Sequence, residues 1–252
     1  MKRLENKVAL ITGGAGSIGQ TTAKLFIEEG AKVILVDLDE ASLKKVTAEL
    51  GDHAAYIAAN VTIAAEVEKY AKEAVKKFGK IDIFFNNAGI EGVVKPIIDF
   101  PEDVFDKVMA VNVKGVFLGC KYVLPQMNDG GSMIITSSVA GLTASPNFVA
   151  YTTSKHATLG IMKTAALEAA PRKIRVNSIH PSPVDNRMMR SIEDGYEPGK
   201  GADVQKAFAA SIPLGRYAAP LEISKLALFL GSDDSQFITG AQYVIDGGQT
   251  TK

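Results

Sequence analysis

Cysteine and tryptophan are almost missing from this 252-residue chain, which has one Cys, no Trp and only 7% aromatic residues. The single thiol, Cys120, excludes an internal disulfide, and there is no Cys pair to bind zinc or to cycle between redox states. Because Cys120 ends the apolar run 116–119, we expect a buried, unreactive thiol rather than a nucleophile. The scarcity of aromatic rings argues against a surface that stacks on sugars or on nucleic-acid bases.

No charge of one sign dominates, because Lys+Arg and Asp+Glu each number 28. The chain therefore lacks the basic excess that binds nucleic acid or anionic lipid. No uninterrupted apolar run approaches the ~18 residues of a membrane span, and the charged N-terminus is not followed by the apolar core of a signal peptide. These absences predict a cytoplasmic globular protein that binds neither nucleic acid nor membrane.

Short apolar runs rich in β-branched residues alternate with longer helical patterns. The expected strands are residues 8–12, 32–37, 54–58, 81–86, 133–137, 174–179 and 243–246, and the clearest helical stretches are 40–50, 63–78 and 104–127. The strands are apolar throughout, which is typical of strands buried on both faces. The pattern predicts an α/β fold, a doubly wound parallel sheet with helices on both faces, in a single domain over residues 1–252.

Only residues 181–213 lack a clear period, and they contain Pro183, Gly195, Pro198 and Gly199. A long irregular segment within a domain is either functional or poorly ordered. We expect a substrate lid at about residues 183–213, with plain disorder as the alternative.

A glycine-rich loop, residues 12–19, joins the first strand to the first helix. Glycines let the backbone approach a pyrophosphate, and the helix N-terminus supplies unpaired amides and a partial positive charge to bind it. Glycine-rich loops also serve as plain tight turns. At the first strand-to-helix junction, however, such a loop indicates a dinucleotide site.

Asp37 ends the second strand, about 20 residues beyond this loop. A carboxylate there accepts hydrogen bonds from the ribose hydroxyls of NAD and repels the extra phosphate of NADP. No nearby Arg or Lys neutralises that phosphate, since Leu38 follows Asp37 and Gly16 and Ser17 lie in the loop. The sequence predicts NAD as the cofactor; the alternative is that Asp37 only caps a turn before the next helix.

Tyr151 and Lys155 are four residues apart, which places both on one face of a helix. A close cation favours the phenolate and lowers the pKa of a tyrosine by roughly 1 to 3 units, which suits it to acid/base work. Tyr196 and Lys200 have the same spacing, but Pro198 and Gly199 lie between them and make a continuous helix improbable. We therefore take Tyr151 as the acid/base.

Other polar groups are expected near Tyr151. Ser137 and Ser138 end the fifth strand, and residues 86–89 (Asn-Asn-Ala-Gly) end the fourth, at the carboxyl edge where open α/β sheets bind ligands. Asn112 is a polar residue inside an apolar helix and calls for a buried partner. Each has a plain structural explanation alone, but together they favour a catalytic site.

These motifs together resemble the short-chain dehydrogenase/reductase family, from Lys7 to Gly248. The resemblance implies a Rossmann fold and an oxidoreductase that transfers hydride between NAD(H) and a secondary alcohol or ketone, with the redox step supplied by the cofactor. It implies that Tyr151 exchanges the proton with the substrate oxygen and that Ser138 orients and polarises this oxygen. Lys155 is implied to hold the nicotinamide ribose and to lower the pKa of Tyr151, and Asn112 to anchor a water that connects Lys155 to solvent.

The resemblance also implies the residues that bind the cofactor. They are Gly13, Ser17, Ile18, Gly19, Asp37, Leu38, Asn60, Val61, Asn87, Ala88, Gly89, Tyr151, Lys155, Pro181, Val184 and Asn186. Four positions depart from the usual pattern: Gly16-Ser17 in the loop, Asn60 where an Asp commonly reaches the adenine, Ser182 where a Gly is common, and Asn186 where a Thr often contacts the nicotinamide amide. Residues 240–248 resemble the subunit-pairing strand of the family and imply a homotetramer.

The residues expected around the substrate are mostly apolar with one carboxylate. They are Glu91, Gly92, Val93, Ser138, Ser145, Phe148, Tyr151 and parts of 188–196. This mixture favours an uncharged secondary alcohol, either cyclic or a diol. Glu91 either reads a second polar group on the substrate or is a solvated loop charge.

Three alternatives remain. The family includes 3-oxoacyl carrier-protein reductases, most of which need NADPH and a basic surface that binds the acidic carrier protein. Asp37 disfavours NADPH. The charges expected near such a surface, Asp129 as well as Arg172 and Lys173, are an equivocal match to it. Sugar dehydrogenases of the family also fit. A different class is a non-catalytic NAD-binding sensor, which the intact Tyr151 and Lys155 disfavour.

Overall fold

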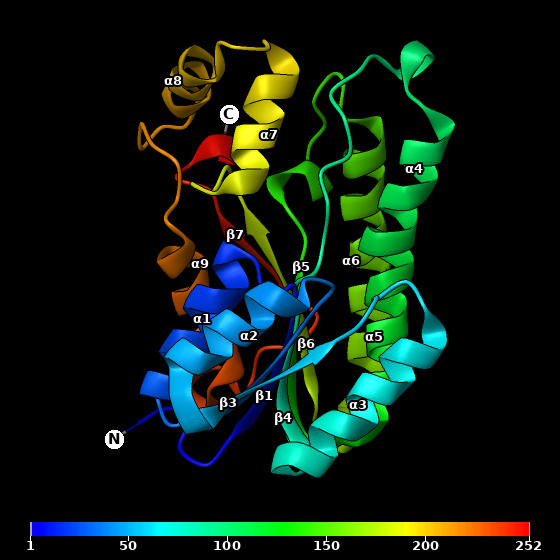
Figure 1. Cartoon of the computed structure of the whole chain (residues 1–252), viewed down its shortest axis with the longest axis vertical. Coiled ribbons are helices and arrows are strands. Elements are labelled where there is room, and N and C mark those ends of the chain that lie inside the picture. The colour runs from blue at the N-terminus through cyan, green and yellow to red at the C-terminus, as the bar shows by residue number, and fades with distance from the viewer. Residues whose placement is uncertain (1, 252) are drawn as a thin grey trace.

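The computed structural model describes residues 2–251, which build a seven-stranded parallel sheet in the order β3-β2-β1-β4-β5-β6-β7 (Figure 1). The strands are β1 (Val8–Thr12), β2 (Lys32–Asp37), β3 (Ala54–Ala58), β4 (Ile81–Asn86), β5 (Met127–Thr136), β6 (Arg175–Pro181) and β7 (Gln242–Ile245). The first four match their expected bounds, and β5 begins six residues before the expected Met133. The predicted doubly wound parallel sheet is therefore confirmed.

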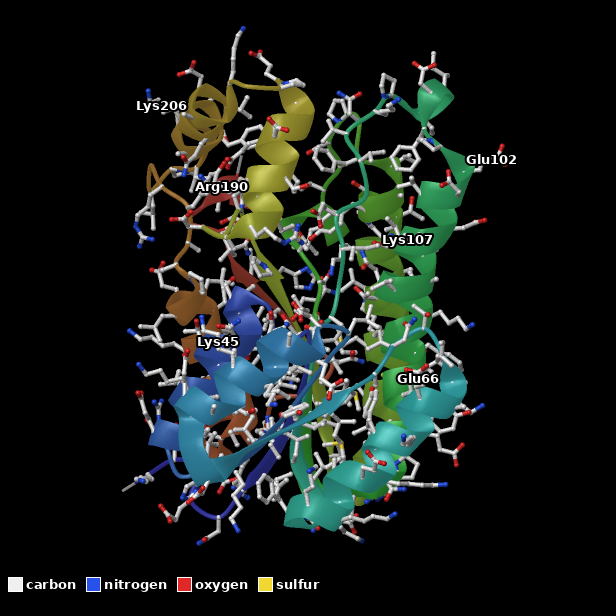
Figure 2. The ribbon with its side chains drawn as sticks, in the orientation of Figure 1. Lys45, Glu66, Glu102, Lys107, Arg190 and Lys206 are labelled. Carbon is white, nitrogen blue, oxygen red and sulfur yellow. The ribbon has the colours of Figure 1, made fainter. Side chains whose placement is uncertain are left out.

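Helices cover both faces of the sheet: α1, α2 and α9 lie on one face, and α3, α4, α5 and α6 lie on the other (Figure 1). The helices are α1 (Ser17–Glu28), α2 (Glu40–Leu50), α3 (Ala64–Phe78), α4 (Glu102–Met109), α5 (Gly115–Val123), α6 (Val149–Ala169), α7 (Arg187–Tyr196), α8 (Gly201–Ser211) and α9 (Pro220–Gly231). Charged side chains such as Lys45, Lys107 and Lys206 are exposed on the outer surfaces of these helices (Figure 2).

Consecutive residues of one strand supply the apolar cores on both sides of the sheet. Leu10 packs in the cluster under α3, α5 and α6, while its neighbour Ile11 packs in the cluster under α1 and α9. Side chains alternate between the two faces of a strand, so a strand covered on both sides must be apolar at every position. This explains why the strands show continuous apolar runs in the sequence.

The long helix expected at residues 104–127 is divided in the structure. A π-helical turn, Ala110–Lys114, lies between α4 and α5 and contains Asn112, whose side chain is fully buried. The run Glu102–Gln126 is long and apolar enough to cross a membrane, but 44% of its most apolar window is buried and it packs against α3 and α6. It therefore has the features of a core helix.

The segment expected to be an irregular lid contains two helices, α7 and α8. Its prolines and glycines misled the prediction, because Pro198 and Gly199 lie in the short connection and leave helical sequence on both sides. In α7 the apolar residues Met189 and Ile192 are buried together on one side. The break after Tyr196 confirms that Tyr196 and Lys200 do not share a helix. In Figure 1, α7 and α8 lie beyond the tips of the strand arrows, at the edge where ligands bind in such folds.

Candidate functional site

The loop after β1 is shaped so that only glycine fits at its tight positions. Gly13 has φ of +68°, and a Cβ there would lie 3.0 Å from Nδ2 of Asn87. A Cβ on Gly14 would lie 2.8 Å from Cβ of Leu35. The loop then enters α1 at Gly16 with no side chain capping the helix among the described residues. The first-turn amides of Ser17, Ile18 and Gly19 therefore suit a phosphate, as the sequence predicted.

Asp37 is held beside this loop. Its Oδ2 accepts a hydrogen bond from the amide of Ala15 at 3.0 Å, and its Oδ1 accepts one from the amide of Leu38 at 2.7 Å. The residue that caps α2 is Asp39, whose side chain accepts from the amide of Ser42. Asp37 thus caps the turn before α2, as the alternative expected, with a further bond at 3.4 Å from the amide of Asp39, while Asp39 caps the helix itself. Each carboxylate oxygen accepts more than one bond, so Asp37 keeps acceptor capacity for ribose hydroxyls.

Asn60 and Val61 follow β3. The side-chain oxygen of Asn60 accepts from the amide and the hydroxyl of Thr62, at 2.9 and 2.8 Å. Its Nδ2 is therefore the group that Asn60 can offer to an adenine. Val61 lies against Gly115 at the start of α5, where a Cβ would lie 3.1 Å from Cγ2 of the valine.

Asn87 and Ala88 fasten the end of β4 to the end of β1. Both of their amides donate to Oγ1 of Thr12, at 3.0 and 3.1 Å, and Nδ2 of Asn87 donates to the Thr12 carbonyl at 3.1 Å. The hydroxyl of Thr136, at the end of β5, donates to Oδ1 of Asn87. Three strand ends are thus locked together, and the backbone of 87–89 is fixed beside the glycine loop.

Lys155 and Tyr151 lie on the same side of α6, as their spacing predicted. The Lys155 ammonium lies 5.4 Å from the centre of the Tyr151 ring, and it donates to the carbonyl of Thr136 at 3.0 Å. The lysine is only 3% exposed, and burial lowers its pKa to about 8. It therefore still carries its charge at neutral pH.

The pKa of Tyr151 differs from the expectation of a lowered value. Burial raises the pKa of Tyr151 to about 12; a hydrogen bond with Ser138 opposes this rise, and the negative charge of Glu91 adds to it. Desolvation penalises the phenolate more than the hydrogen bond stabilises it. In this structure Tyr151 therefore holds its proton at neutral pH.

The expectation that Asn112 has a buried partner is confirmed. Its Oδ1 accepts from the amide of Ile90 at 2.8 Å, and its Nδ2 donates to the carbonyl of Ile90 at 2.9 Å. Nδ2 also donates to the hydroxyl of Ser154, which in turn donates to the carbonyl of Tyr151. Asn112 thus joins the loop after β4 to the helix that carries the tyrosine. Its implied role in anchoring a water stays a prediction.

Residues after β6 face the same edge. Val184 forms a parallel bridge with Ala218, in which the carbonyl of Pro183 and the amide of Asp185 bond to Ala218. The amide and carbonyl of Val184 itself therefore point away from Ala218, as a backbone contact to the nicotinamide amide requires. Asn186 caps α7 by accepting from the amide of Met189 at 3.1 Å. Its side-chain oxygen thus has a structural role that the sequence did not suggest.

An apolar group lies where α7 and α8 meet the loop before α6. Phe148, just before α6, lies 5.7 Å from Tyr196 of α7 with the rings tilted by 39°, and Tyr196 in turn meets Phe208 of α8 edge-on at 5.2 Å. Val94 packs against the same cluster. Glu91 pairs with Arg187, the first residue of α7. Ser145, predicted to contact substrate, is exposed on its loop.

Two residues of this region were missed in the sequence. Arg187 was hidden in a segment read as irregular, and only the fold brings it to Glu91. His180 interrupts the apolar strand β6 and lies fully buried beside Ser138. A lone polar residue in an apolar strand demands a partner, and that signal was available for His180 as it was for Asn112.

A family model described as Enoyl-(Acyl carrier protein) reductase matches residues 13–250. Cyclohexanol dehydrogenase of Acinetobacter is 36% identical over 99% of this chain and 97% of its own length. The chain belongs to the short-chain dehydrogenase/reductase family. The family binds nicotinamide cofactors, and this member is an oxidoreductase for secondary alcohols and ketones.

Solved structures of short-chain dehydrogenases/reductases are closely similar along the whole chain. Levodione reductase superposes with a TM-score of 0.95 at 35% identity, and the match covers 99% of both chains. The 3-ketoacyl-(acyl-carrier-protein) reductase of Brucella melitensis, complexed with NADH, gives 0.90 at 33% identity over 98% of this chain and 99% of its own.

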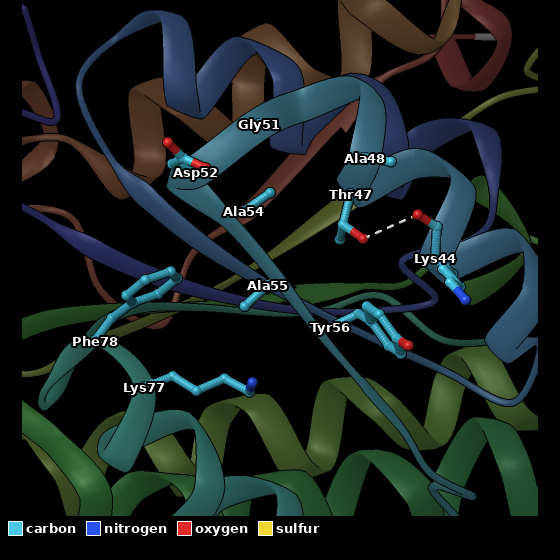
Figure 3. A pocket seen from close by; sticks show the side chains of 10 residues that line it. All are labelled: Lys44, Thr47, Ala48, Gly51, Asp52, Ala54, Ala55, Tyr56, Lys77 and Phe78. Carbon is cyan, nitrogen blue, oxygen red and sulfur yellow. Dashed lines mark hydrogen bonds between the residues drawn. The ribbon is translucent and has the colours of Figure 1, made fainter.

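A separate hollow of about 860 Å³ lies along the edge strand β3 of the dehydrogenase/reductase fold (Figure 3). Its lining residues are Lys44, Thr47, Ala48, Gly51, Asp52, Ala54, Ala55, Tyr56, Lys77 and Phe78. They come from α2, the short turn after it, the edge strand β3 and the end of α3, and none is a predicted site residue. The hollow therefore belongs to the outer edge of the sheet and not to the family site.

Proposed function

We propose that this protein is an NAD-dependent dehydrogenase for an uncharged cyclic secondary alcohol and the matching ketone. The observation that carries the proposal is the group of Tyr151, Ser138 and Lys155. A phenol that keeps its proton is hydrogen-bonded to a serine hydroxyl and has a buried ammonium 5.4 Å from its ring. Two hydroxyls that converge on one point suit the single oxygen of a ketone or alcohol.

The residues fit a nicotinamide dinucleotide. The first-turn amides of α1 suit its pyrophosphate, and the loop carries glycine at Gly13, Gly14 and Gly19, where a Cβ would be crowded by neighbouring atoms. Asp37 is proposed to accept from the adenosine ribose hydroxyls and to exclude the phosphate of NADP. Lys155 is proposed to bind the nicotinamide ribose, and the Val184 amide to bind the nicotinamide amide. When bound, the cofactor supplies or accepts the hydride.

The proton chemistry is proposed for the protein's own residues. Tyr151 donates its proton to the ketone oxygen during reduction and takes it back from the alcohol during oxidation. Ser138 donates a hydrogen bond to the same oxygen and stabilises the charge that develops on it. Lys155, with its pKa at about 8, remains an ammonium at neutral pH and stabilises the phenolate that Tyr151 leaves behind.

The apolar group of Phe148, Tyr196 and Val94 supports a hydrocarbon ring as the body of the substrate. A flat aromatic surface removes such a ring from water without needing a hydrogen bond. The similarity to a cyclohexanol dehydrogenase agrees with this size and polarity. Glu91 is proposed to accept a hydrogen bond from a second hydroxyl on the ring.

The second candidate is a 3-oxoacyl carrier-protein reductase, which the similarity to the Brucella enzyme favours. This activity needs a basic surface for an acidic carrier. Arg172 is committed elsewhere: it pairs with Asp129 at 2.8 Å and donates to the carbonyls of Leu124 and Met127. These bonds weaken the case for a carrier site there.

The test offers NAD and NADP separately with cyclohexanol, cyclic diols, linear secondary alcohols and a 3-hydroxyacyl thioester, and follows the absorbance of reduced nicotinamide. We expect turnover of the cyclic alcohols with NAD. Turnover only of the thioester, with NADP, would overturn the proposal in favour of the carrier-protein reductase. The Tyr151→Phe variant should bind NADH and lose at least ~10²-fold in kcat; a sensor would have no turnover to lose.

We further propose a homotetramer. Exposed apolar side chains support it, including Phe117 on α5, Leu167 on α6 and Val244 on β7, which are 49%, 78% and 43% exposed. Contacts between copies would cover them. Light scattering after gel filtration tests this mass directly, and a monomer would contradict it.

A further inference from the structure

His180 is fully buried at the carboxyl end of β6 and makes a hydrogen bond with each ring nitrogen. Its Nδ1 lies 2.9 Å from the carbonyl oxygen of Ser138, and its Nε2 lies 2.8 Å from the hydroxyl of Ser178. A carbonyl oxygen can only accept, so Nδ1 carries the proton and Nε2 accepts from Ser178. The contacts therefore select one tautomer of the neutral ring.

The charge state of His180 agrees with this assignment. Burial lowers the pKa of His180, and the positive charges of Lys155 and His156 act in the same direction, while the bond to Ser138 opposes them. A neutral ring at pH 7 is what an Nδ1–H donor paired with an Nε2 acceptor requires.

The Ser138 carbonyl is held by two hydrogen bonds of 2.9 Å, one from the amide of Gly141 in the same loop and one from His180 on β6. The Ser138 hydroxyl accepts from the amide of Ala140 at 3.2 Å and faces the carbonyl of Pro181 at a long 3.4 Å. The bond from His180 is the one of these that comes from a side chain on another strand. It connects β6 to the residue whose hydroxyl is bonded to Tyr151.

We propose that His180 is a positioning residue, whose Nδ1–H fixes the Ser138 backbone so that the Ser138 hydroxyl stays on the substrate oxygen beside Tyr151. The proposal rests on the function proposed above. A leucine would fill a buried strand position without the cost of placing an imidazole in the core, so packing alone does not explain the histidine. A displacement of about 1 Å at a reacting group costs on the order of 10²-fold in rate.

Two substitutions separate the donor from the bulk of the side chain. His180→Asn keeps an N–H near the position of Nδ1, whereas His180→Leu removes both hydrogen bonds. We expect kcat to fall on the order of 10- to 100-fold in His180→Leu and to stay within about 3-fold of wild type in His180→Asn. The Kd for NADH should stay within about 2-fold in both. Equal kcat in both variants, or a parallel loss of NADH binding, would overturn the proposal.

A matched control removes a buried hydrogen bond elsewhere. The Ser132 hydroxyl on β5 donates to the carbonyl of Leu230 at 2.7 Å. Ser132→Ala should lower Tm without changing kcat, which shows how a purely structural loss behaves.

A double-mutant cycle with Ser138→Ala identifies the route of the effect. If His180 acts through the Ser138 hydroxyl, His180→Leu should cost less than about 3-fold in the Ser138→Ala background. A full additional loss in that background would contradict the proposal.

The tautomer is measured without activity, so the inference is separable from the proposed function. The chain has three histidines, and the His180→Asn spectrum assigns the missing one in a ¹⁵N-histidine NMR experiment. We expect the His180 signals of a neutral Nδ1–H ring from pH 6 to 8. An Nε2–H tautomer, or a ring charged at pH 7, would refute the proposal whatever the enzyme turns over. If the wild type turns over no alcohol but the His180 ring is found as the Nδ1–H tautomer, the proposed dehydrogenase function is wrong, whereas the hydrogen bond from His180 to Ser138 is confirmed.

Discussion

Glu91 pairs with Arg187 at the carboxyl edge of the sheet, with 3.4 Å between Oε1 and Nη1. Glu91 lies in the loop after β4, next to the Ile90 backbone that Asn112 holds, and Arg187 begins the lid helix α7. The Glu91 side chain is 11% exposed and that of Arg187 is 77% exposed. Because the arginine is exposed to solvent, this ion pair contributes little to stability. The Glu91 carboxylate is mostly buried, and its negative charge raises the pKa of Tyr151.

The first prediction concerns the charge of Glu91. Its carboxylate repels the phenolate and raises the pKa of Tyr151, so Glu91→Gln should lower this pKa. For ketone reduction, which needs protonated Tyr151, the alkaline limb of kcat/KM against pH should move to lower pH, by up to about 1 unit. Arg187→Gln is the control, because it keeps the carboxylate and removes its partner; its limb should stay or move to higher pH. A shift of both variants to lower pH would contradict the role of Glu91.

The second prediction concerns the cost of burying Lys155. Its pKa falls from 10.5 to about 8, which corresponds to about 3 kcal/mol of lost stability at neutral pH. The cost is fully present below pH 8 and disappears as the pH rises to about 10.5, where the unfolded chain also loses this proton. Lys155→Met should therefore raise Tm by a few degrees at pH 7 and abolish turnover, and its advantage should shrink above pH 8.

Lys163→Met is the matched control for Lys155, since Lys163 is an exposed lysine on the same helix. Its Tm should change little at any pH. Thermal unfolding by circular dichroism from pH 6 to 10 measures both variants. A lower Tm for Lys155→Met at pH 7 would show that the lost bond to Thr136 outweighs the relief of desolvation.

The third prediction concerns cofactor choice. Asp37→Ala removes the proposed acceptor for the ribose, and a lost hydrogen bond to a charged group is worth about 1.5–3 kcal/mol. The kcat/KM for NAD should fall roughly 10- to 100-fold, and the NADP to NAD ratio should rise. Asp39→Ala, two residues away, removes the same charge and only the cap of α2, so it should cost stability without changing the ratio. Equal effects in both variants would indicate that the cofactor ratio responds to the loss of any nearby negative charge and not to the loss of a ribose contact.

The fourth prediction concerns the attachment of the lid. Glu193 of α7 is 1% exposed and accepts from the hydroxyl of Tyr217 at 2.9 Å, while Arg190 (Figure 2) pairs with it at 3.3 Å. Tyr217→Phe should cost about 1–3 kcal/mol and increase hydrogen exchange in α7, because a buried carboxylate loses a donor. Tyr56→Phe is the control, since its hydroxyl lies 3.5 Å from an exposed Glu40. If hydrogen exchange in α7 were unchanged in Tyr217→Phe, the bond between Tyr217 and Glu193 would not control the mobility of α7, which would contradict the prediction.

Local signals in the sequence predicted most of the fold. The apolar runs of β1, β2 and β4 gave their bounds because strands inside a sheet that is covered on both faces are apolar along their length, and the edge strand β3 was found by its short apolar run although it is only partly buried. The four-residue interval between Tyr151 and Lys155 placed both on one helix face, because the period of an α-helix is fixed by its backbone. The expectation of a buried Cys120 is confirmed at 6% exposure, and burial raises the pKa of its thiol to about 12.

Signals that depend on distant residues were not available in the same way. Helices α7 and α8 were missed because Pro198 and Gly199, which only break the chain between them, were taken as signs that the whole segment is irregular. The raised pKa of Tyr151 was missed because desolvation is a sum over all neighbours, whereas the spacing to Lys155 shows one of them. The single-domain reading and the cytoplasmic location stay predictions.

The sequence by itself thus determined the parallel sheet and the glycine-rich loop, since backbone periodicity and glycine conformation are local properties, and it predicted the set of reacting groups. Only the tertiary structure decided that Asp37 is tied to Ala15, that Glu91 meets Arg187 and that His180 stands behind Ser138. These pairs are 22, 96 and 42 residues apart in the chain. Chain folding brings them within hydrogen-bonding or ion-pair distance, and no periodicity in the sequence encodes a contact at such separations.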